Sequence, residues 1–357
     1  NKFDMSFLQL KRIIAHCLGN VCEFDKIISK QKDRYILCFH RVISHLEAEK
    51  DGMHDSLWIS PERLIALIEW MREVGDIVDC IEILNTEINN DRPLFALSFD
   101  DGWKDTYSNA FPILKHYNVP ATVFLVSNAL ETGDLFWTED IRVKTSRIIK
   151  SENDNIVKNA LLENWPEIDY RKKNIRHPLK LKTVDEWVEV LKRVDRDERR
   201  QRIDNFYQRL GVSKFPLKGY IMTWDDARRM KKHHIRFGSH SHSHAILENL
   251  PSKQIEKEVD ESKDLISKRL QIKLESFCYP NGRYSGTEAA LLSNCGYRYG
   301  FILNNMSLKH CKNKFYTPRF IVNENNMNNL SYFKMCLLQI PLYRSKPHKA
   351  NVGKDKY

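Results

Sequence analysis

Two neighbouring aspartates follow an apolar run in the segment LFALSFDDG. The run covers residues 94–99, and Asp100 and Asp101 come directly after it. Two adjacent, half-buried carboxylates repel each other and lose hydration, so they need compensation from a metal ion, a cationic side chain or good hydrogen bonding. The pair therefore predicts a charged site at the end of a buried strand, and a metal there needs further ligands from elsewhere in the chain.

Histidines gather in the segment GSHSHSHAIL. His240 and His244 are four residues apart, so one helical turn would bring both imidazoles to the same side. His240 and His242 would share a face if the segment stayed extended. The apolar residues that follow favour the pair of His240 and His244, with His242 beside the site or exposed. Two imidazoles and one carboxylate with open coordination positions form a common catalytic site for zinc and several other divalent ions.

Apolar runs and helical patterns alternate along the chain, and these elements must position the two groups. In parallel α/β folds, reactive side chains lie on loops at the carboxyl ends of the strands. The alternation predicts such a fold, as an open sheet or a barrel. The predicted strands cover residues 35–43, 94–99, 121–127, 235–239, 276–279 and 298–303, and the predicted helices start at Pro61, near 104, at Ser252 and near 286.

Three segments lie outside this alternation. Residues 131–220 are rich in charge and tryptophan and predict a helical insertion that acts as a lid or selects the substrate. Residues 6–21 have apolar side chains at helical spacing, so we expect an amphipathic helical segment within 1–34 that docks on the protein body, with membrane binding as the weaker alternative. Residues 344–357 predict a basic, flexible tail.

The composition is that of a folded soluble protein. Of the 357 residues, 42% are hydrophobic and 29% charged, which excludes a disordered chain. No window approaches the roughly 18 uninterrupted apolar residues of a membrane span. The first residues lack the pattern of a signal peptide, and the eight cysteines form no CxxC pair. We therefore expect a cytoplasmic protein with reduced thiols, or a periplasmic one if a leader or anchor precedes Asn1.

The net charge of +10 favours an anionic partner. An acidic membrane face, a phosphorylated carrier and nucleic acid all carry such charge. No helix-turn-helix, zinc-finger spacing or aromatic single-strand platform is present, so we expect no nucleic acid. Charge alone does not choose among the remaining partners, so peripheral contact with the inner membrane face stays an open alternative, and the oligomeric state is not predicted.

Three segments resemble, in order, the motifs of the polysaccharide deacetylase family, also called NodB-like or carbohydrate esterase family 4. SFDDG matches the first motif, HSHSH matches the second in the form H-[ST]-x-x-H, and YPNG matches the third. The resemblance covers roughly residues 35–127 and 220–322. It implies a deformed (β/α)7 barrel, here over residues 35–343 with the helical insertion, and hydrolysis of N-acetyl groups on sugars.

The resemblance also implies roles for individual residues. Asp101, His240 and His244 would bind a divalent metal ion, most often zinc, with cobalt or nickel as alternatives. Asp100 would be the general base. The backbone N–H of Asn281, in YPNG, would contact the tetrahedral oxyanion together with the metal.

Two departures from the family pattern need replacements. The late L-x-H histidine is missing, but CFHRV resembles the N-terminal motif of circularly permuted members such as the deacetylases of poly-N-acetylglucosamine export, which makes His40 the general acid. The alternative for His40 is a structural histidine that caps a strand. Cys278 occupies the place of the arginine that orients the base, and we expect Arg319, in TPRFIV, to pair with Asp100 instead.

Aromatic side chains near the motifs are candidates for sugar binding. Trp103, Tyr279 and Tyr284 would stack on the apolar face of a sugar, although packing in the core is the favoured interpretation for Trp103 and Tyr284. The predicted function is metal-dependent N-deacetylation of an N-acetylated sugar in a surface polysaccharide or lipid-linked glycan precursor. A catalytically silent glycan-binding module and a hydrolase of non-sugar amides are the alternatives.

Overall fold

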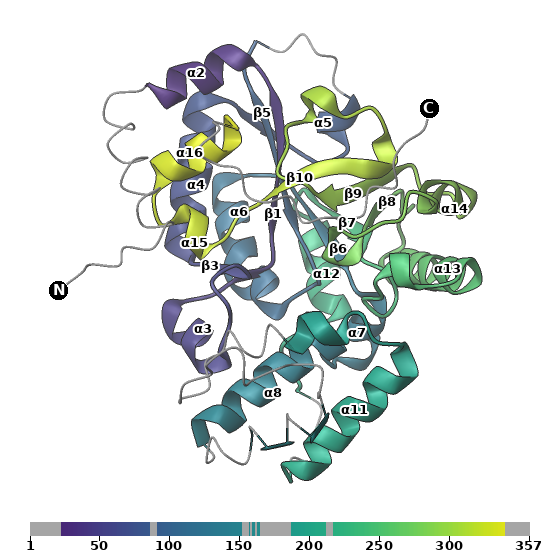
Figure 1. Cartoon of the computed structure of the whole chain (residues 1–357). Coiled ribbons are helices and arrows are strands. Elements are labelled where there is room, and N and C mark those ends of the chain that lie inside the picture. Colours follow the sequence, from purple (N-terminus) through teal and green to yellow (C-terminus); the bar gives the residue numbers. More distant parts are fainter. Residues whose placement is uncertain are drawn as a thin grey trace, which may run out of the picture. The chain divides into compact units, whose positions relative to one another are not determined.

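Seven parallel strands form a closed barrel in this structure, a computed structural model (Figure 1). Each strand pairs with the next one in the chain, and the last pairs with the first. The predicted (β/α)7 barrel is therefore confirmed. The barrel strands are β1 (Arg34–Phe39), β5 (Leu94–Phe99), β6 (Ala121–Leu125), β7 (Ile235–Ser239), β8 (Ser276–Cys278), β9 (Tyr299–Leu303) and β10 (Thr317–Ile321). The structure describes residues 23–85, 91–151, 157, 159–160, 163–164, 187–211 and 217–339.

The barrel strands are apolar because both of their faces are covered. All six residues of β5 are buried, as expected for a parallel strand between a packed interior and surrounding helices. An eighth strand, β4 (Asp76–Val78), pairs with the first half of β5. It was not predicted, because its three residues are exposed or half-buried and form no apolar run.

Helices cover the outside of the barrel (Figure 1). Ser60 precedes α4, which starts at Pro61 as predicted, because proline has the backbone angle of a first helical residue. Thr223 and Asp226 form a capping box at the start of α12. The described helices of the barrel unit are α2 (Phe24–Gln31), α4 (Pro61–Val74), α5 (Glu82–Asn85), α6 (Phe111–Tyr117), α7 (Ser127–Thr132), α12 (Trp224–Lys231), α13 (Ser252–Leu270), α14 (Glu288–Asn294), α15 (Glu324–Met327) and α16 (Leu330–Leu337).

The predicted strand over residues 35–43 is divided at His40. β1 ends at Phe39, and the next strand, β2 (Arg41–Val42), pairs outside the barrel with β3 (Trp58–Ile59). The sequence pattern could not show this break, because apolar residues lie on both sides of His40 and Arg41 while the pairing partner changes.

A second compact unit consists of residues 44–54 and 134–220. Its described helices are α3 (His45–Asp51), α8 (Trp137–Ser151) and α11 (Arg196–Arg209). Ile141, Trp187, Leu191 and Phe206 are buried in its own hydrophobic core. Most of this unit falls in the predicted insertion, whereas residues 44–54 were not predicted to belong to it.

Some expectations concern residues outside the described ranges. These are the helix over 6–21, the tail over 344–357, and Cys17 and Cys22. The six described cysteines are free, and four of them are buried. None of the helices within the described ranges is both long and apolar enough to span a bilayer.

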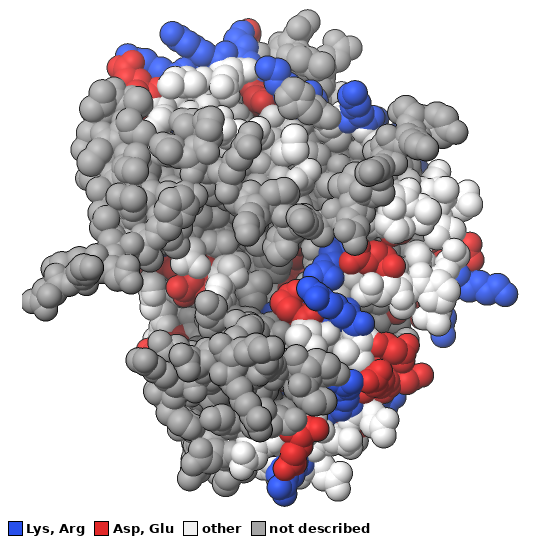
Figure 2. Space-filling view, in the orientation of Figure 1, with Lys and Arg blue, Asp and Glu red and all other residues white. Residues whose placement is uncertain are grey.

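Acidic and basic side chains lie next to one another on the described part of the face in Figure 2. Exposed ion pairs of the barrel unit show the same mixing of charge, for example Lys26 with Glu23 at 2.5 Å and Arg92 with Asp76 at 2.7 Å. Exposed pairs of this kind stabilise a fold by about 0–1 kcal/mol.

Candidate metal centre and catalytic site

The register of two barrel strands brings His40 and Asp100 to the same end of the barrel. Phe39 pairs with Phe99 in the parallel ladder of β1 and β5, and the Asp100 N–H donates to the Phe39 carbonyl at 2.9 Å. His40 and Asp100 are therefore the first residues after two neighbouring strands. This carboxyl end of a barrel is where reactive groups gather in such folds.

Arg319 lies inside the barrel against Asp100. Its Nη1 donates to Asp100 Oδ1 at 2.7 Å, and its Nη2 donates to Asp100 Oδ2 at 2.8 Å. The side chains of Arg319 and Asp100 are 0% and 2% exposed. Two parallel hydrogen bonds fix the carboxylate in orientation as well as in charge. The two side chains thus have the arrangement expected from the sequence.

This environment keeps Asp100 ionised. Burial would raise the pKa of its carboxyl, but the positive charge of Arg319 and its two hydrogen bonds hold that pKa well below its usual range. Burial likewise disfavours the charged form of Arg319, while Asp100 raises the pKa of the guanidinium and keeps it protonated. Asp100 is therefore a carboxylate at neutral pH without any metal ion.

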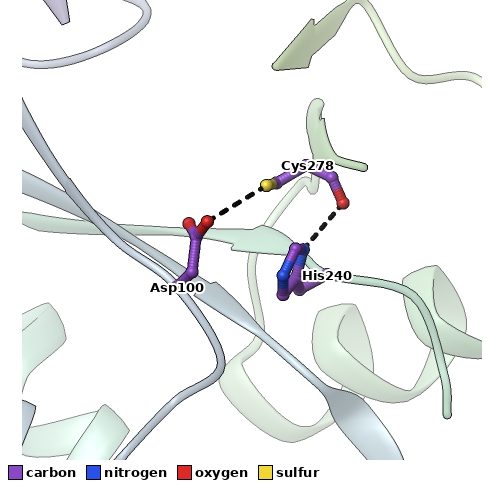
Figure 3. Close-up of side chains that lie close together, drawn as sticks. All are labelled: Asp100, His240 and Cys278. Carbon is purple, nitrogen blue, oxygen red and sulfur yellow. Dashed lines mark hydrogen bonds between the residues drawn. The ribbon is translucent and has the colours of Figure 1, made fainter. Parts of the chain in front are cut away.

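Two buried thiols complete the surroundings of Asp100. Cys38 Sγ lies 3.3 Å from Asp100 Oδ2, and Cys278 Sγ lies 3.6 Å from the same oxygen. Burial raises the pKa of both thiols, so they are protonated and can donate to the carboxylate. Figure 3 shows Cys278 between Asp100 and His240: its carbonyl accepts a hydrogen bond from His240 Nδ1 at 2.8 Å.

Asp101 lies between the imidazoles of His240 and His244. Its Oδ1 is 3.4 Å from Nε2 of His240 and 3.4 Å from Nε2 of His244. One ligand atom from each of the three residues falls within 4.8 Å of the others, and all three residues are buried. These residues form a candidate metal site.

The donor set fits a divalent ion such as zinc. Because the Cys278 carbonyl can only accept, His240 carries its proton on Nδ1 and turns the lone pair of Nε2 toward Asp101. Burial also lowers the pKa of His240, which favours the neutral imidazole that a metal needs. Two imidazole nitrogens and one carboxylate oxygen are typical of catalytic zinc.

A second set of three residues also has ligand atoms close enough together to hold an ion. Asp100, His240 and Cys278 each have a ligand atom within 4.8 Å of the others. Arg319 Nη2, however, lies 2.9 Å from Cys278 Sγ and also binds Asp100. A guanidinium in that position disfavours a metal cation, so Asp101, His240 and His244 are the better site.

The histidine segment is a loop, so the predicted helical turn is wrong. Ser241 and His244 have left-handed backbone angles, with φ of 62° and 58°. Glu258, on α13, accepts hydrogen bonds from the N–H groups of His242 and Ser243 at 3.1 and 2.8 Å and from the Ser243 hydroxyl at 2.6 Å. This anchored loop, rather than a helix, brings His244 beside His240.

The YPNG segment forms a tight turn after β8. Asn281 lies in the 3-10 turn η3 (Pro280–Gly282) with a left-handed φ of 57°. Gly282 has φ of 65°, and a Cβ there would lie 2.8 Å from Leu303, so the turn requires glycine. The turn places Asn281 at the same end of the barrel as Asp100 and His240.

The aromatic candidates differ in exposure. Trp103 is 1% exposed, and its indole N–H donates to Asp101 Oδ2 at 2.9 Å. Tyr279 is also fully buried. Their burial argues against the predicted stacking of sugar on these two rings. Tyr284 is half-buried, and its ring stacks on Tyr316 with centroids 4.6 Å apart.

Several residues of the site were not predicted. Cys38, Arg41, Asp105 and Glu258 all contact predicted site residues or the segments that carry them. Arg41 and Glu258 gave a signal that could have been used, because each is a charged residue in an otherwise apolar strand or helix face. Such charges usually have a buried partner.

Comparisons with known proteins agree with this geometry. The family model described as "Polysaccharide deacetylase" matches residues 87–159 and 200–300. A comparison with curated proteins found no match.

Solved structures with the same fold include three bacterial proteins. The Streptococcus pyogenes deacetylase PplD is 18% identical, with 84% of this chain and 96% of that chain covered and a TM-score of 0.54. IcaB from Ammonifex degensii is 15% identical, with 85% of this chain and 97% of that chain covered and a TM-score of 0.51. A de-N-acetylase from Aggregatibacter actinomycetemcomitans is 17% identical, with 82% of this chain and 95% of that chain covered and a TM-score of 0.51.

The matched ranges contain the SFDDG and HSHSH segments, whose side chains converge at the carboxyl end of a seven-stranded barrel. The chain therefore matches the polysaccharide deacetylase family over these ranges, and the match indicates a hydrolase that acts on carbon–nitrogen bonds of N-acetylated sugars.

Proposed function

We propose that this protein is a metal-dependent deacetylase that removes N-acetyl groups from a sugar of a surface polysaccharide or a lipid-linked glycan precursor. One observation carries the proposal: a carboxylate paired with Arg319, Asp100, lies directly beside three buried residues that could hold a metal ion, Asp101, His240 and His244. Such a pair can hydrolyse an amide with water, because it supplies a base for the water and a cation for the developing negative charge.

Asp101, His240 and His244 would hold the ion. When bound, a divalent cation such as zinc acidifies water and polarises the acetamide carbonyl. Cys278 fixes the tautomer of His240 through its carbonyl, and Trp103 fixes Asp101 through its indole N–H. These contacts hold one nitrogen and one oxygen toward the centre of the site.

Asp100 would act as the general base. Its carboxylate is ionised and held by Arg319, so it is ready to accept a proton from the attacking water. The same arginine makes Asp100 a weak base, which suits a water that is already acidified. The backbone N–H of Asn281 would stabilise the oxyanion at the attacked carbon.

His40 would act as the general acid. An amide hydrolyses only if the departing amine receives a proton, and His40 lies at the neighbouring strand end beside Asp100. Names of the similar structures support deacetylation as the reaction: PplD was solved as a deacetylase in complex with acetate, and another protein is described as a de-N-acetylase.

Acetate release tests the proposal. The wild-type protein, loaded with zinc or cobalt, is incubated with N-acetylglucosamine oligomers and with acetylated lipid-linked sugars. We expect release that falls by roughly 1,000-fold or more in Asp100→Asn, because that variant keeps the shape of the site but cannot accept the proton. Stoichiometric metal binding without acetate from any of these sugars would instead support a silent glycan-binding module. Turnover of small amides alone would support a hydrolase of non-sugar amides.

A further inference from the structure

Arg41 and Asp105 form a buried ion pair next to the segment that carries His40. Arg41 Nε donates to Asp105 Oδ2 at 2.9 Å, and the two side chains are 6% and 7% exposed. Asp105 Oδ1 also accepts the N–H of Val42 at 2.7 Å. Both carboxylate oxygens of Asp105 therefore hold the two residues of β2, directly after His40.

The aromatic ring of Trp103 connects this pair with the metal site. The guanidinium carbon of Arg41 lies 4.8 Å from the centre of the Trp103 ring, close enough for a cation–π interaction. The indole N–H on the edge of the same ring donates to Asp101 Oδ2. Asp101 has its other oxygen, Oδ1, between the two imidazoles. One continuous set of contacts thus runs from Asp105 through Arg41 and Trp103 to a metal ligand.

A second side chain, that of Asn109, also holds β2 in place. Asn109, four residues after Asp105, donates from Nδ2 to the Val42 carbonyl at 2.8 Å. Asp105 immediately precedes a π-helical turn, η1 (Thr106–Ala110). Such turns shift the side chains of a helix relative to a regular α-helix and are frequent at functional sites. Here Asp105 directly precedes the turn and Asn109 lies within it, and both bind Val42.

We propose that Arg41 and Asp105 are positioning residues for the metal ligand Asp101, and that they act on it through Trp103. This inference rests on the proposed metal site. Asp101 has a left-handed backbone, with φ of 76°, which a non-glycine residue adopts only when its surroundings fix it. A ring held by a buried cation on its face presents its N–H in one orientation, and the ligand oxygen Oδ1 is then pre-oriented before any ion arrives.

Metal affinity tests the inference independently of catalysis. The apo-protein is titrated with Co²⁺, followed by the visible absorption of the bound ion, and with Zn²⁺ in competition with a chromophoric chelator. Trp103→Phe removes the indole N–H together with the five-membered ring but keeps an aromatic face, and we expect about 10-fold weaker binding, as for other partners of metal ligands. Arg41→Met removes the cation but keeps an unbranched apolar stem, and we expect a loss of similar size.

A double-mutant cycle distinguishes transmission through Trp103 from general destabilisation. If Arg41 acts through the indole, Arg41→Met weakens binding by less than about twofold when Trp103 is already phenylalanine. Arg63→Met is the matched control, because it removes another ion pair of the barrel unit, Arg63 with Glu324, and should leave Co²⁺ affinity and absorption unchanged. Urea unfolding at equal pH shows whether each apo-variant is folded.

Two results would overturn the inference. One is an equal loss of affinity from Arg41→Met in both backgrounds, and the other is no loss in either. In each case the wild-type protein still binds metal, so the proposed function stands. A wild-type protein that binds neither Co²⁺ nor Zn²⁺ would overturn the proposed metal site itself.

Discussion

The interior of the barrel below Asp100 and the loops around Asp101 stabilise two neighbouring carboxylates in different ways. Asp100 faces Arg319 and two thiols, so the folded chain itself compensates its charge. Asp101 faces two imidazoles and one indole N–H, none of which is a permanent cation. The difference shows why two carboxylates can lie side by side. One has its cation built in, and the other is arranged to receive one.

The largest expected effect concerns His40, on the Asp100 side. We expect His40→Ala to lower turnover of N-acetyl sugars by about 100- to 10,000-fold, the usual contribution of a general acid. Hydrolysis of 4-nitrophenyl acetate should fall far less, because its leaving group departs without a proton. Initial rates on both substrates, at saturating zinc, check this. Equal losses on both would show that His40 has a structural role and is not the proton donor.

A second prediction removes the built-in cation. Arg319→Met leaves Asp100 buried without its partner, and we expect the unfolding free energy of the apo-protein at pH 7 to fall by about 3–5 kcal/mol. In the double variant Arg319→Met/Asp100→Asn the buried charge is gone, so much of this loss should be recovered. Urea unfolding of the three proteins measures it. A double variant as unstable as Arg319→Met would show that the lost stability does not come from the uncompensated charge of Asp100.

The stability of Arg319→Met should also change with pH in the opposite direction to that of the wild type. In the wild type the pKa of Asp100 is lowered on folding, so its pairing stabilises the protein above the ordinary carboxyl range and is lost as the pH falls through the lowered pKa. In Arg319→Met, burial without the guanidinium should raise the pKa of Asp100 above its unfolded value. That variant then loses stability as the pH rises. The difference in unfolding free energy between the two proteins should therefore narrow from pH 7 toward pH 4.

The smallest expected effect concerns the Asp101 side. Glu258 anchors the loop that carries His244 through three hydrogen bonds, and Glu258→Gln should weaken zinc binding by about 10-fold. His242→Ala is the control in the same loop, with an expected change below about twofold, since His242 contacts Ser127 and Glu261 rather than the ligand atoms. Isothermal titration calorimetry with zinc measures the affinity of both variants. A larger loss from His242→Ala would make His242 part of the metal site.

Sequence patterns predicted the elements whose stability comes from local composition. The segments 94–99 and 235–239 are strands with these same boundaries, because all of their residues except Arg236 are buried. The break at His40 was not predictable, since it arises when β2 leaves the barrel to pair with β3 and to contact Asp105. The motifs identified the candidate metal ligands, but the shape of the histidine loop depends on hydrogen bonds to Glu258, on the helix α13 that follows the loop, and the spacing of the histidines does not show these bonds.

The most direct test of the central claim is a zinc titration of Asp100→Asn beside Asp101→Asn. Both variants replace a carboxylate by its amide at adjacent positions, so they are matched in size and place. The account predicts that Asp100→Asn binds zinc with nearly wild-type affinity while releasing no acetate, and that Asp101→Asn loses at least about 100-fold in affinity. Loss of zinc from Asp100→Asn, with binding retained in Asp101→Asn, would contradict the assignment of base and ligand.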